Sequence, residues 1–582
     1  MRTPGLQYLY LQKPLTLLIL IATLSVLPWL GMGDYYTKGE PREASVAVSM
    51  LEEGNWILPR VYADEFAYKP PFTHWLMALS SLPQGEVTPF TSRLPSAIAF
   101  IIMVGSCFIF FGRKLKGQKS FVACLILITS FELHRAAMTS RVDMTLTCLI
   151  VTGLISLFFW VEDKKLRGLP WYIPVIFGCA ALVKGPVGII LPLLIFGIYL
   201  LFIHYKLKTI IWKLGLVAIL SLIPLLIWYS LAYREVGRPF LDVVVAENFG
   251  RFLGSNNLNI QYNLGHEVPF WYNFVTLTTG FIPWTLLLLF SLFSLKYSLK
   301  VPQLKDVWNK LLVMDRIKLF SLVAAVVIII FYCIPVSKRS VYLMPAYPFI
   351  AIFIAQYMIY IAEYHSKVNR IFAVFLGSLV GIVCLLCLLT LFGLVSPQSL
   401  LSSIIHSKKT LYDTGLIEIA LAQSSVLYIA LLAGLCYALF SLFHQLKKKN
   451  NLKILYATFG LYFALNILLD GVVLPAFKDG TSVKPFVAEM KSAYPLTKDN
   501  MYVMNNLLVY GNLYGLNFYL KNSFQNFETV QPKEGFFFTT SSSFEIIKVK
   551  YDSAYTFTLL EQTDNRYNDM RDIVQLYQIQ QK

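Results

Sequence analysis

The chain has 582 residues, of which 56% are hydrophobic and 14% are charged. A soluble core cannot take up so much apolar surface, so the composition excludes an ordinary soluble enzyme and predicts a polytopic α-helical membrane protein. The net charge of +17 comes largely from Lys and Arg clusters between hydrophobic segments. It therefore indicates membrane topology and contact with membrane lipids. No basic stripe coincides with a nucleic-acid-binding module, which argues against a nucleic-acid partner.

About thirteen hydrophobic segments are long enough to cross a bilayer as helices. They are expected to begin near Pro14, Leu94, Ser120, Val142, Trp171, Pro186, Ile210, Phe270, Ile317, Val341, Ile371, Ile417 and Lys453. The basic clusters at 113–119, 206–213 and 447–453 fall on alternate connections, on the same side as Arg2 and Lys13. Because positively charged short loops stay in the cytoplasm, we expect a cytoplasmic N-terminus and an external C-terminus.

The chain is expected to consist of a transmembrane domain, residues 1–474, and a small external α/β domain, residues 475–582. Two long outer loops, 32–93 and 233–269, belong to the transmembrane domain. In the C-terminal part the composition becomes mixed, and four short runs separated by turn residues predict strands. These runs are MYVMNNLLVYG (501–511), FYLKN (518–522), GFFFTT (535–540) and YTFTLLEQ (555–562).

The first outer loop, residues 32–93, is the most informative segment. Connections between packed helices usually run about two to eight residues, and this loop is far longer and rich in acids and bases. Residues 43–53 alternate small, apolar and charged positions in a way that suits a short amphipathic helix at the membrane interface. Just before it, Gly39 and Pro41 are expected to hold Glu40 out of a helix. Such a loop resembles half of an active site.

Glu40 and Asp143 are the leading candidate carboxylates. Asp143 lies at the mouth of a span, where a charge must be paired or face water. Arg141 is its candidate partner, although an ordinary helix-end ion pair explains the pattern as well. Lys69 precedes two prolines that keep the backbone extended, which suits a phosphate contact, with a snorkelling lysine as the alternative. Lys184 lies at a Gly-Pro break between two apolar segments, where the exposed backbone must be wet or lined by protein.

Other cations fall on the outer side against the positive-inside trend. Lys338 and Arg339 precede one span, and Arg251 lies in the second large outer loop with His266. His266 is a candidate metal ligand, although a lone histidine is more often structural. The sequence contains no P-loop, no Rossmann fingerprint and no G-x-S-x-G motif, so machinery for ATP hydrolysis or hydride transfer is not visible.

These segments together resemble the aminoarabinose transferase (ArnT-like) family of C-type glycosyltransferases, which is related to the protein O-mannosyltransferases. The matching segments follow the family's order from Gly33 to Ala351. They are GEPREASVAVSMLEEGNWILPR, YKPPFTHWL, RVDMTLT, LVKGPVGIILPLL, ENFGRF, GHEVPFWYNF with GFIPWTL, and SKRSVYLMPAYPFIA. The resemblance implies the C-type glycosyltransferase fold and a place in the bacterial inner membrane, with the reaction and the C-terminal domain on the periplasmic side. It also implies a polyprenyl (undecaprenyl) phosphate sugar donor, an acceptor such as lipid A or another envelope glycan, and inversion at the anomeric carbon.

The resemblance and the residues together give a set of expected roles. Glu40, Asp143 and Lys69 are the expected catalytic residues. The expected contacts to donor phosphate or substrate are Arg42, Glu43, Asp34, Arg141, Lys184, Arg251, Lys338 and Arg339. Where the family often has Asp-Glu this chain has Gly39-Glu40, which leaves the leading carboxylate open among Glu40, Glu43 and Asp34. Where the family often has Glu before the lysine this chain has Tyr68, which removes half of a metal site. No cofactor is therefore assigned with certainty, and His266 stays as a weak candidate for binding a divalent metal ion.

Three alternatives remain at this point. The first is an O-mannosyltransferase-like enzyme that acts on protein or on a surface glycan. The second, from a different class, is a lipid or solute transporter or flippase, which would place polar groups near the bilayer midplane and show repeated halves. Here the charges gather on one side and no repeat is evident. The third is a non-catalytic membrane scaffold that uses its C-terminal domain for binding. The function of such a scaffold would not change when Glu40 and Lys69 are replaced. The protein is expected to act as a monomer.

Overall fold

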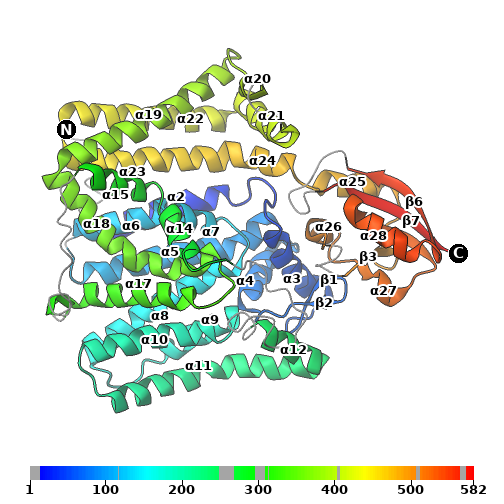
Figure 1. Ribbon diagram of the computed structural model, residues 1–582, viewed down its shortest axis with the longest axis horizontal. Coiled ribbons are helices and arrows are strands. Elements are labelled where there is room, and N and C mark those ends of the chain that lie inside the picture. The colour runs from blue at the N-terminus through cyan, green and yellow to red at the C-terminus, as the bar shows by residue number, and fades with distance from the viewer. Residues whose placement is uncertain are drawn as a thin grey trace.

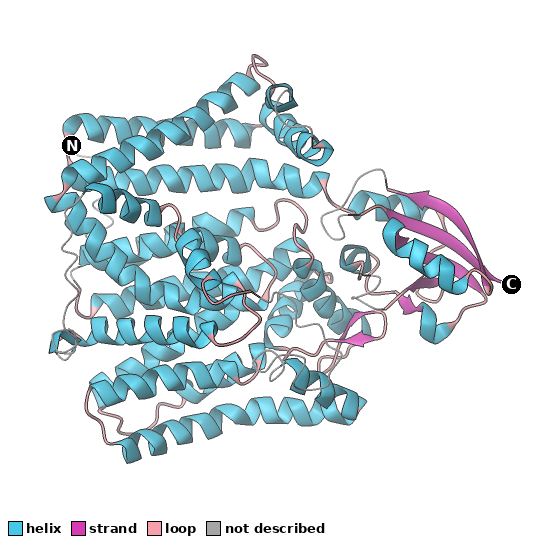
Figure 2. Ribbon diagram, viewed as in Figure 1, coloured by secondary structure: helices cyan, strands magenta, loops and turns pink. Residues whose placement is uncertain are grey.

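A computed structural model describes residues 13–115, 117–247, 268–294, 309–311, 313–402, 407–505, 511–563 and 572–582. The molecule consists of a large body of roughly aligned helices and a smaller domain that projects from one end (Figures 1 and 2). The strands of the larger sheet all lie in that smaller domain, near the C-terminus (Figure 2).

The helical body contains the membrane segments. Eight described helical runs are long and apolar enough to cross a membrane, or ten if each of two bent pairs is one span. The long runs are α5 (Pro89–Gly112), α8 (Val142–Lys164), α11 (Leu207–Val236), α17 (Arg316–Cys333), η5 (Ser340–Ala346) with α18 (Tyr347–Tyr364), α19 (Ser366–Leu391), α22 (Val426–Lys448), and α23 (Asn451–Leu468) with η6 (Leu469–Val473) and α24 (Leu474–Gly480). The bent pairs are α6 (Gly117–Thr129) with α7 (Phe131–Ala137), and α14 (Tyr272–Gly280) with α15 (Trp284–Ser294).

Among the described residues, three shorter apolar segments also belong to the body: α2 (Pro14–Val26) with η1 (Leu27–Trp29), α9 (Tyr172–Lys184) and α10 (Val187–Phe202). The predicted number of about thirteen segments is reached only when these three are counted with the longer runs. One predicted boundary is wrong. The span expected near Ile417 begins at Val426, because α21 (Lys408–Ala422) is a separate helix that follows α20 (Pro397–Ser402).

The break predicted at Lys184 positions part of the site. Helix α9 ends there because Gly185 adopts φ +75°, a left-handed value that favours glycine. The chain then turns and returns as α10. A Cβ at Gly188 would lie 2.5 Å from the Ala180 backbone, so glycine allows the two helices to pack closely. Lys184 therefore stands at the tip of a tight helical hairpin.

The first outer loop folds into α3 (Gly39–Glu53), a hairpin of β1 (Arg60–Tyr62) and β2 (Glu65–Phe66), α4 (Phe72–Ser81) and the short η2 (Leu82–Gln84). Helix α3 begins at Gly39, so the expectation that Gly39 and Pro41 keep Glu40 out of a helix is wrong. The first helical N–H groups have no intrahelical acceptor, so proline is tolerated in the first turn. The predicted helix at 43–53 is therefore extended by one turn at its start.

The C-terminal domain contains a five-stranded sheet in the order β4-β3-β5-β7-β6. β3 is parallel to β4 and β5, and β7 is antiparallel to β5 and β6. Its elements are α25 (Lys484–Ala493), β3 (Met501–Val503), α26 (Tyr514–Tyr519), β4 (Gln525–Asn526), α27 (Phe527–Val530), β5 (Glu534–Thr540), α28 (Ser541–Tyr551), β6 (Tyr555–Gln562) and β7 (Val574–Gln581).

Three of the four predicted strand runs contain a strand. The fourth, FYLKN, is wrong, because it forms the end of α26 and the turn that follows. Its aromatic residues favour strands in general, but here α26 packs on α3 and the Phe518 ring meets that of Tyr35 edge to face, so the tertiary contact overrides that propensity. The expected domain boundary at residue 475 falls inside α24, and the helix continues to Gly480.

The hydrophobic core has two main parts. One cluster runs through the membrane helices. A second joins α3 and its hairpin, through residues such as Met50 and Tyr62, to Phe486 and Leu516 of the C-terminal domain. The C-terminal domain is thus packed on the first outer loop by a shared core, and α12 (Arg238–Val245) lies at the same end of the body (Figure 1).

Candidate active site

The main cavity opens at the end of the helical body that carries the C-terminal domain. The empty space between its walls is about 1120 Å³, including the open mouth. The first outer loop, α8, the α9–α10 turn, α11, α12 and the segment before η5 all contribute to its wall. The lining residues with charged or aromatic side chains are Arg42, Tyr68, Lys69, Arg141, Asp143, Lys184, Tyr229, Glu247, Tyr332, Arg339 and Tyr342.

The cavity has an excess of positive charge. Its basic side chains are Arg42, Lys69, Arg141, Lys184 and Arg339, and its carboxylates are Asp143 and Glu247. The sequence predicted all five of these cations, which lie up to 297 positions apart. A concave surface with such an excess attracts anions, and Arg and Lys are the usual ligands of phosphate.

Asp143 is held by two of these cations. Its Oδ1 lies 2.6 Å from Lys184 Nζ, and its Oδ2 lies 3.6 Å from Arg141 Nε. The ammonium of Lys184 also lies 4.2 Å from the centre of the Tyr342 ring. The carboxylate occupies the first turn of α8, where the helix dipole favours a negative charge. The expected pairing of Asp143 with Arg141 is present, and Lys184 is the closer partner.

Lys69 belongs to a buried chain of charges. Its Nζ forms an ion pair with Glu43, whose other oxygen lies 2.8 Å from His74 Nε2. Burial alone would raise the pKa of Glu43, but Lys69 and then His74 hold that pKa well below its ordinary value. Burial lowers the pKa of Lys69, and Glu43 opposes that change. Glu43 therefore fixes the lysine from behind while the lysine faces the cavity.

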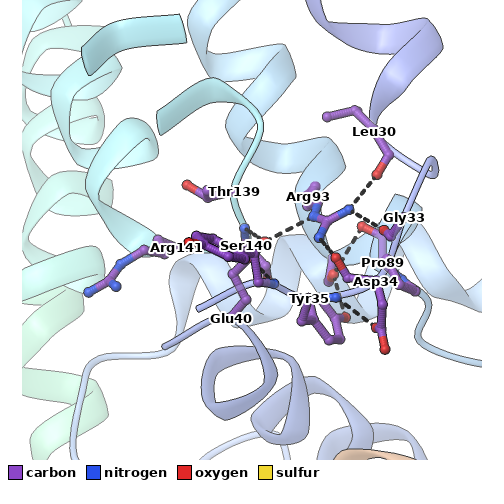
Figure 3. Close-up of polar contacts among 12 residues, drawn as sticks. Leu30, Gly33, Asp34, Tyr35, Glu40, Pro89, Arg93, Thr139, Ser140 and Arg141 are labelled. Carbon is purple, nitrogen blue, oxygen red and sulfur yellow. Dashed lines mark hydrogen bonds and ion pairs between the residues drawn. The ribbon is translucent and has the colours of Figure 1, made fainter. Parts of the chain in front are cut away.

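Glu40 lies in a different network, beside Arg93 and Ser140 (Figure 3). Its side chain is 1% exposed and is not among the residues that line the cavity. Its Oε1 accepts from Arg93 Nε at 2.9 Å and from the Ser140 amide at 3.3 Å. Its Oε2 accepts from the Tyr36 amide at 3.1 Å. These bonds tie the start of α3 to α5 and to the segment just before α8.

Arg93 is the central donor of this network, which we call the Glu40–Arg93 clamp. Besides Glu40, its guanidinium donates to the carbonyl oxygens of Leu30 at 2.8 Å, Gly33 at 3.0 Å and Asp34 at 2.8 Å. The sequence reasoning did not select Arg93. It could have been found from its position, because an arginine at the start of an apolar segment needs a partner for its charge.

Arg141 points away from the Glu40–Arg93 clamp (Figure 3). A Cβ on Gly39 would lie 2.6 Å from one guanidinium nitrogen of Arg141, so any larger residue at position 39 would displace that side chain. The departure from the family's Asp-Glu pair at Gly39 thus makes room for a cation at the cavity.

The remaining predicted residues are not all at the cavity. Asp34 accepts from Ser482 and Tyr519 of the C-terminal part, beside a second, smaller cavity. Lys338 is buried, and its Nζ donates to the carbonyl oxygens of Pro335 at 2.6 Å and Val268 at 3.1 Å. Its neighbour Arg339 does line the main cavity, with an Nε that is buried and has no hydrogen-bond partner among the described residues.

Arg251 and His266 lie outside the described residues. Within the described ranges no group of three His, Cys, Asp or Glu side chains is arranged to hold a metal ion. Tyr68, which stands where the family often has Glu, turns its ring toward Arg42, with the guanidinium carbon 5.4 Å from the ring centre. The residues around Tyr68 therefore do not fit the metal site that the resemblance implies.

Comparison with known proteins supports the resemblance seen in the sequence. Residues 68–228 match the family described as dolichyl-phosphate-mannose-protein mannosyltransferase. Two relatives are named undecaprenyl phosphate-alpha-4-amino-4-deoxy-L-arabinose arabinosyl transferase. The one from Shewanella sediminis is 26% identical over 58% of this chain and 58% of its own length. Its counterpart from Proteus mirabilis, numbered 2, is 25% identical over 55% of this chain and 54% of its own length. The chain thus matches less than two thirds of the length of either.

The fold comparison covers almost the whole chain. The crystal structure of ArnT from Cupriavidus metallidurans bound to undecaprenyl phosphate superposes with a TM-score of 0.70 at 15% identity, over 96% of this chain and 97% of that one. The same protein in the apo state gives a TM-score of 0.66. The predicted fold, a membrane-embedded C-type glycosyltransferase body with a small C-terminal domain, is confirmed.

Proposed function

We propose that this protein is an integral membrane glycosyltransferase that takes a sugar from a polyprenyl phosphate donor and transfers it to a lipid A or other cell-envelope acceptor. The observation that carries the proposal is the cavity with its five cations and the paired Asp143 at one end of the membrane body. The similarity to arabinosyl transferases named for undecaprenyl phosphate supports the choice of donor. The enzyme would work at the periplasmic face of a bacterial inner membrane, and the positive-inside rule applied to the basic loops supports this orientation.

The charge of the site suits the proposed reaction. A new bond forms between an acceptor oxygen and the anomeric carbon of the sugar, while the bond from that carbon to the donor phosphate oxygen breaks. The phosphate, singly charged as a diester, leaves as a polyprenyl phosphate monoester with one more negative charge. Arg42, Lys69 and Arg339 are placed to stabilise that charge, and such preorganised stabilisation is usually the largest single catalytic contribution.

Asp143 would either accept a proton from the acceptor or orient the transferred sugar. If the acceptor is a hydroxyl group, Asp143 would accept its proton as general base. If the acceptor is a phosphate, no proton moves and Asp143 would orient the sugar through its hydroxyl groups. Either role requires an ionised carboxylate, which Lys184 and Arg141 favour. A single displacement of this kind inverts the anomeric carbon.

The test is sugar transfer by the purified protein with a polyprenyl phosphate sugar and lipid A. We expect Asp143→Asn to lower the rate by about a hundredfold or more, the scale of one preorganised charge contact. Asp163→Asn is the matched control. Asp163 lies on the same helix about 30 Å away at 1.5 Å per residue, in an exposed ion pair with Arg113, and it should leave the rate unchanged.

The outcome also separates the alternatives. Transfer to a protein in place of lipid A would favour an O-mannosyltransferase-like acceptor. Movement of the lipid across a vesicle membrane without sugar transfer would favour a flippase. Equal rates for Asp143→Asn and wild type would refute the proposed site.

A further inference from the structure

The C-terminal domain reaches the cavity through one of its cations, Arg42. The guanidinium carbon of Arg42 lies 5.4 Å from the ring centre of Tyr68 and 5.7 Å from that of Tyr514, which belongs to the C-terminal domain. Aromatic faces at this range attract a cation. A guanidinium nitrogen of Arg42 also lies 3.8 Å from Glu65 Oε1. Arg42 is thus held by two rings and a carboxylate, and of these Tyr514 and Glu65 do not line the cavity.

A neighbouring residue of the same domain, Asn512, orients two of these partners at once. Its amide Nδ2 donates to Glu65 Oε2 at 3.3 Å and to the Tyr514 hydroxyl at 3.0 Å. Asn512 is 0% exposed and Tyr514 is 1% exposed. Because buried polar groups in such networks have few alternative partners, they fix one arrangement.

Residues 512–514 are also attached to the β1–β2 hairpin of the first outer loop. The Leu513 amide donates to the Tyr62 hydroxyl at 3.2 Å, and the Tyr62 and Tyr514 rings meet edge to face with centres 5.4 Å apart. None of residues 512–514 lines the cavity. Arg42, which does line the cavity, is in contact with Tyr514 and links this segment to the cavity.

We propose that Asn512 and Tyr514 are positioning residues, through which the C-terminal domain sets the orientation of Arg42 toward the donor phosphate. The C-terminal domain then completes the phosphate site without touching the substrate, and catalysis requires it to be docked on the first outer loop. This inference rests on the proposed function, in which Arg42 contacts the phosphate of a polyprenyl donor.

The experiment compares Tyr514→Leu with Tyr514→Phe in the full-length protein. Two quantities are measured per folded molecule: kcat/KM for the polyprenyl phosphate sugar, and the Kd for undecaprenyl phosphate alone. The leucine variant loses the aromatic face and should lower kcat/KM about tenfold and weaken lipid phosphate binding. The phenylalanine variant keeps that face and should stay within about threefold of wild type.

Two controls separate positioning from a general loss of structure. Tyr555→Leu removes another buried tyrosine of the same domain, in a separate hydrophobic cluster. It should lower stability and leave kcat/KM per folded molecule unchanged. In the second control, Tyr514→Leu is combined with Arg42→Ala. A residue that acts through Arg42 should have no further effect once Arg42 is absent.

The possible results are distinct. Unchanged kcat/KM and Kd in Tyr514→Leu, or full additivity with Arg42→Ala, would overturn the positioning role. A wild-type protein that binds undecaprenyl phosphate without transferring sugar would refute the proposed function, while the Kd comparison would still test the role of Tyr514. A wild-type protein that neither binds the lipid phosphate nor transfers sugar would refute both.

Discussion

Replacing Glu40 by Gln tests whether this carboxylate is structural or catalytic. Glu40 and Arg93 are both buried, with side chains 1% exposed, and they are joined at 2.9 Å. Removing one partner of a buried ion pair typically costs about 3–5 kcal/mol, because the other charge is left uncompensated. Arg93 would retain its three carbonyl acceptors. We therefore expect the lower end of that range, about 3 kcal/mol.

The assay is thermal stability in detergent together with sugar transfer per folded molecule. Glu40→Gln should lower the apparent Tm clearly, while the folded fraction keeps more than about a tenth of the wild-type rate. Glu53→Gln is the matched control, because Glu53 lies at the other end of α3 and pairs with Arg60 in a more exposed setting. It should cost no more than about 1 kcal/mol.

The difference in stability between wild type and Glu40→Gln should change with pH in a definite direction. Although burial alone would raise the pKa of Glu40, Arg93 and Lys478 lower that pKa below its ordinary value. A carboxylate whose pKa is lower in the folded state stabilises the protein above its unfolded pKa, about 4.3. The stability gap between wild type and Glu40→Gln should therefore be complete at pH 7 and shrink as the pH falls below about 4.3. Unchanged stability with a hundredfold loss of transfer would refute this reasoning and make Glu40 catalytic.

Lys69→Ala should reduce transfer by about a hundredfold with folded protein retained, measured by the purified-enzyme assay, and a near-normal rate would remove Lys69 from the site. Glu43→Gln should impair both rate and stability, because it leaves Lys69 without its buried partner; a change in stability alone would show that Lys69 holds its position unaided. Arg339→Ala should raise the KM for the donor, whereas Lys338→Ala should act on thermal stability, since Lys338 is bound by backbone carbonyls; the reverse pattern would exchange their roles. For topology, a cysteine at the exposed position of Glu86 should be labelled from outside intact cells and one at Lys448 should not, and external labelling at Lys448 would reverse the orientation.

Much of the fold followed from local signals in the sequence. Hydrophobic length and basic loops predicted the membrane body, because a bilayer imposes its thickness on each helix separately. The Gly-Pro break at Lys184 was predicted correctly because left-handed backbone at Gly185 is a local property. The five cavity cations were also among the predicted site residues, four of them from their local sequence settings and Arg42 with the family resemblance.

Only the tertiary structure decided how these charges are partnered. Glu40 was expected at the substrate, but Arg93, 53 positions away along the chain, ties it into a buried clamp. Lys338 and Arg339 are adjacent and equally charged, yet one is bound by backbone carbonyls and the other faces the cavity. The sequence determines which ionisable groups lie near the membrane surface. Which of them neutralise one another and which remain for a substrate depends on distances of a few ångströms between segments far apart in the chain, because the attraction of two charges weakens with separation and is stronger in a buried, low-dielectric site than in water.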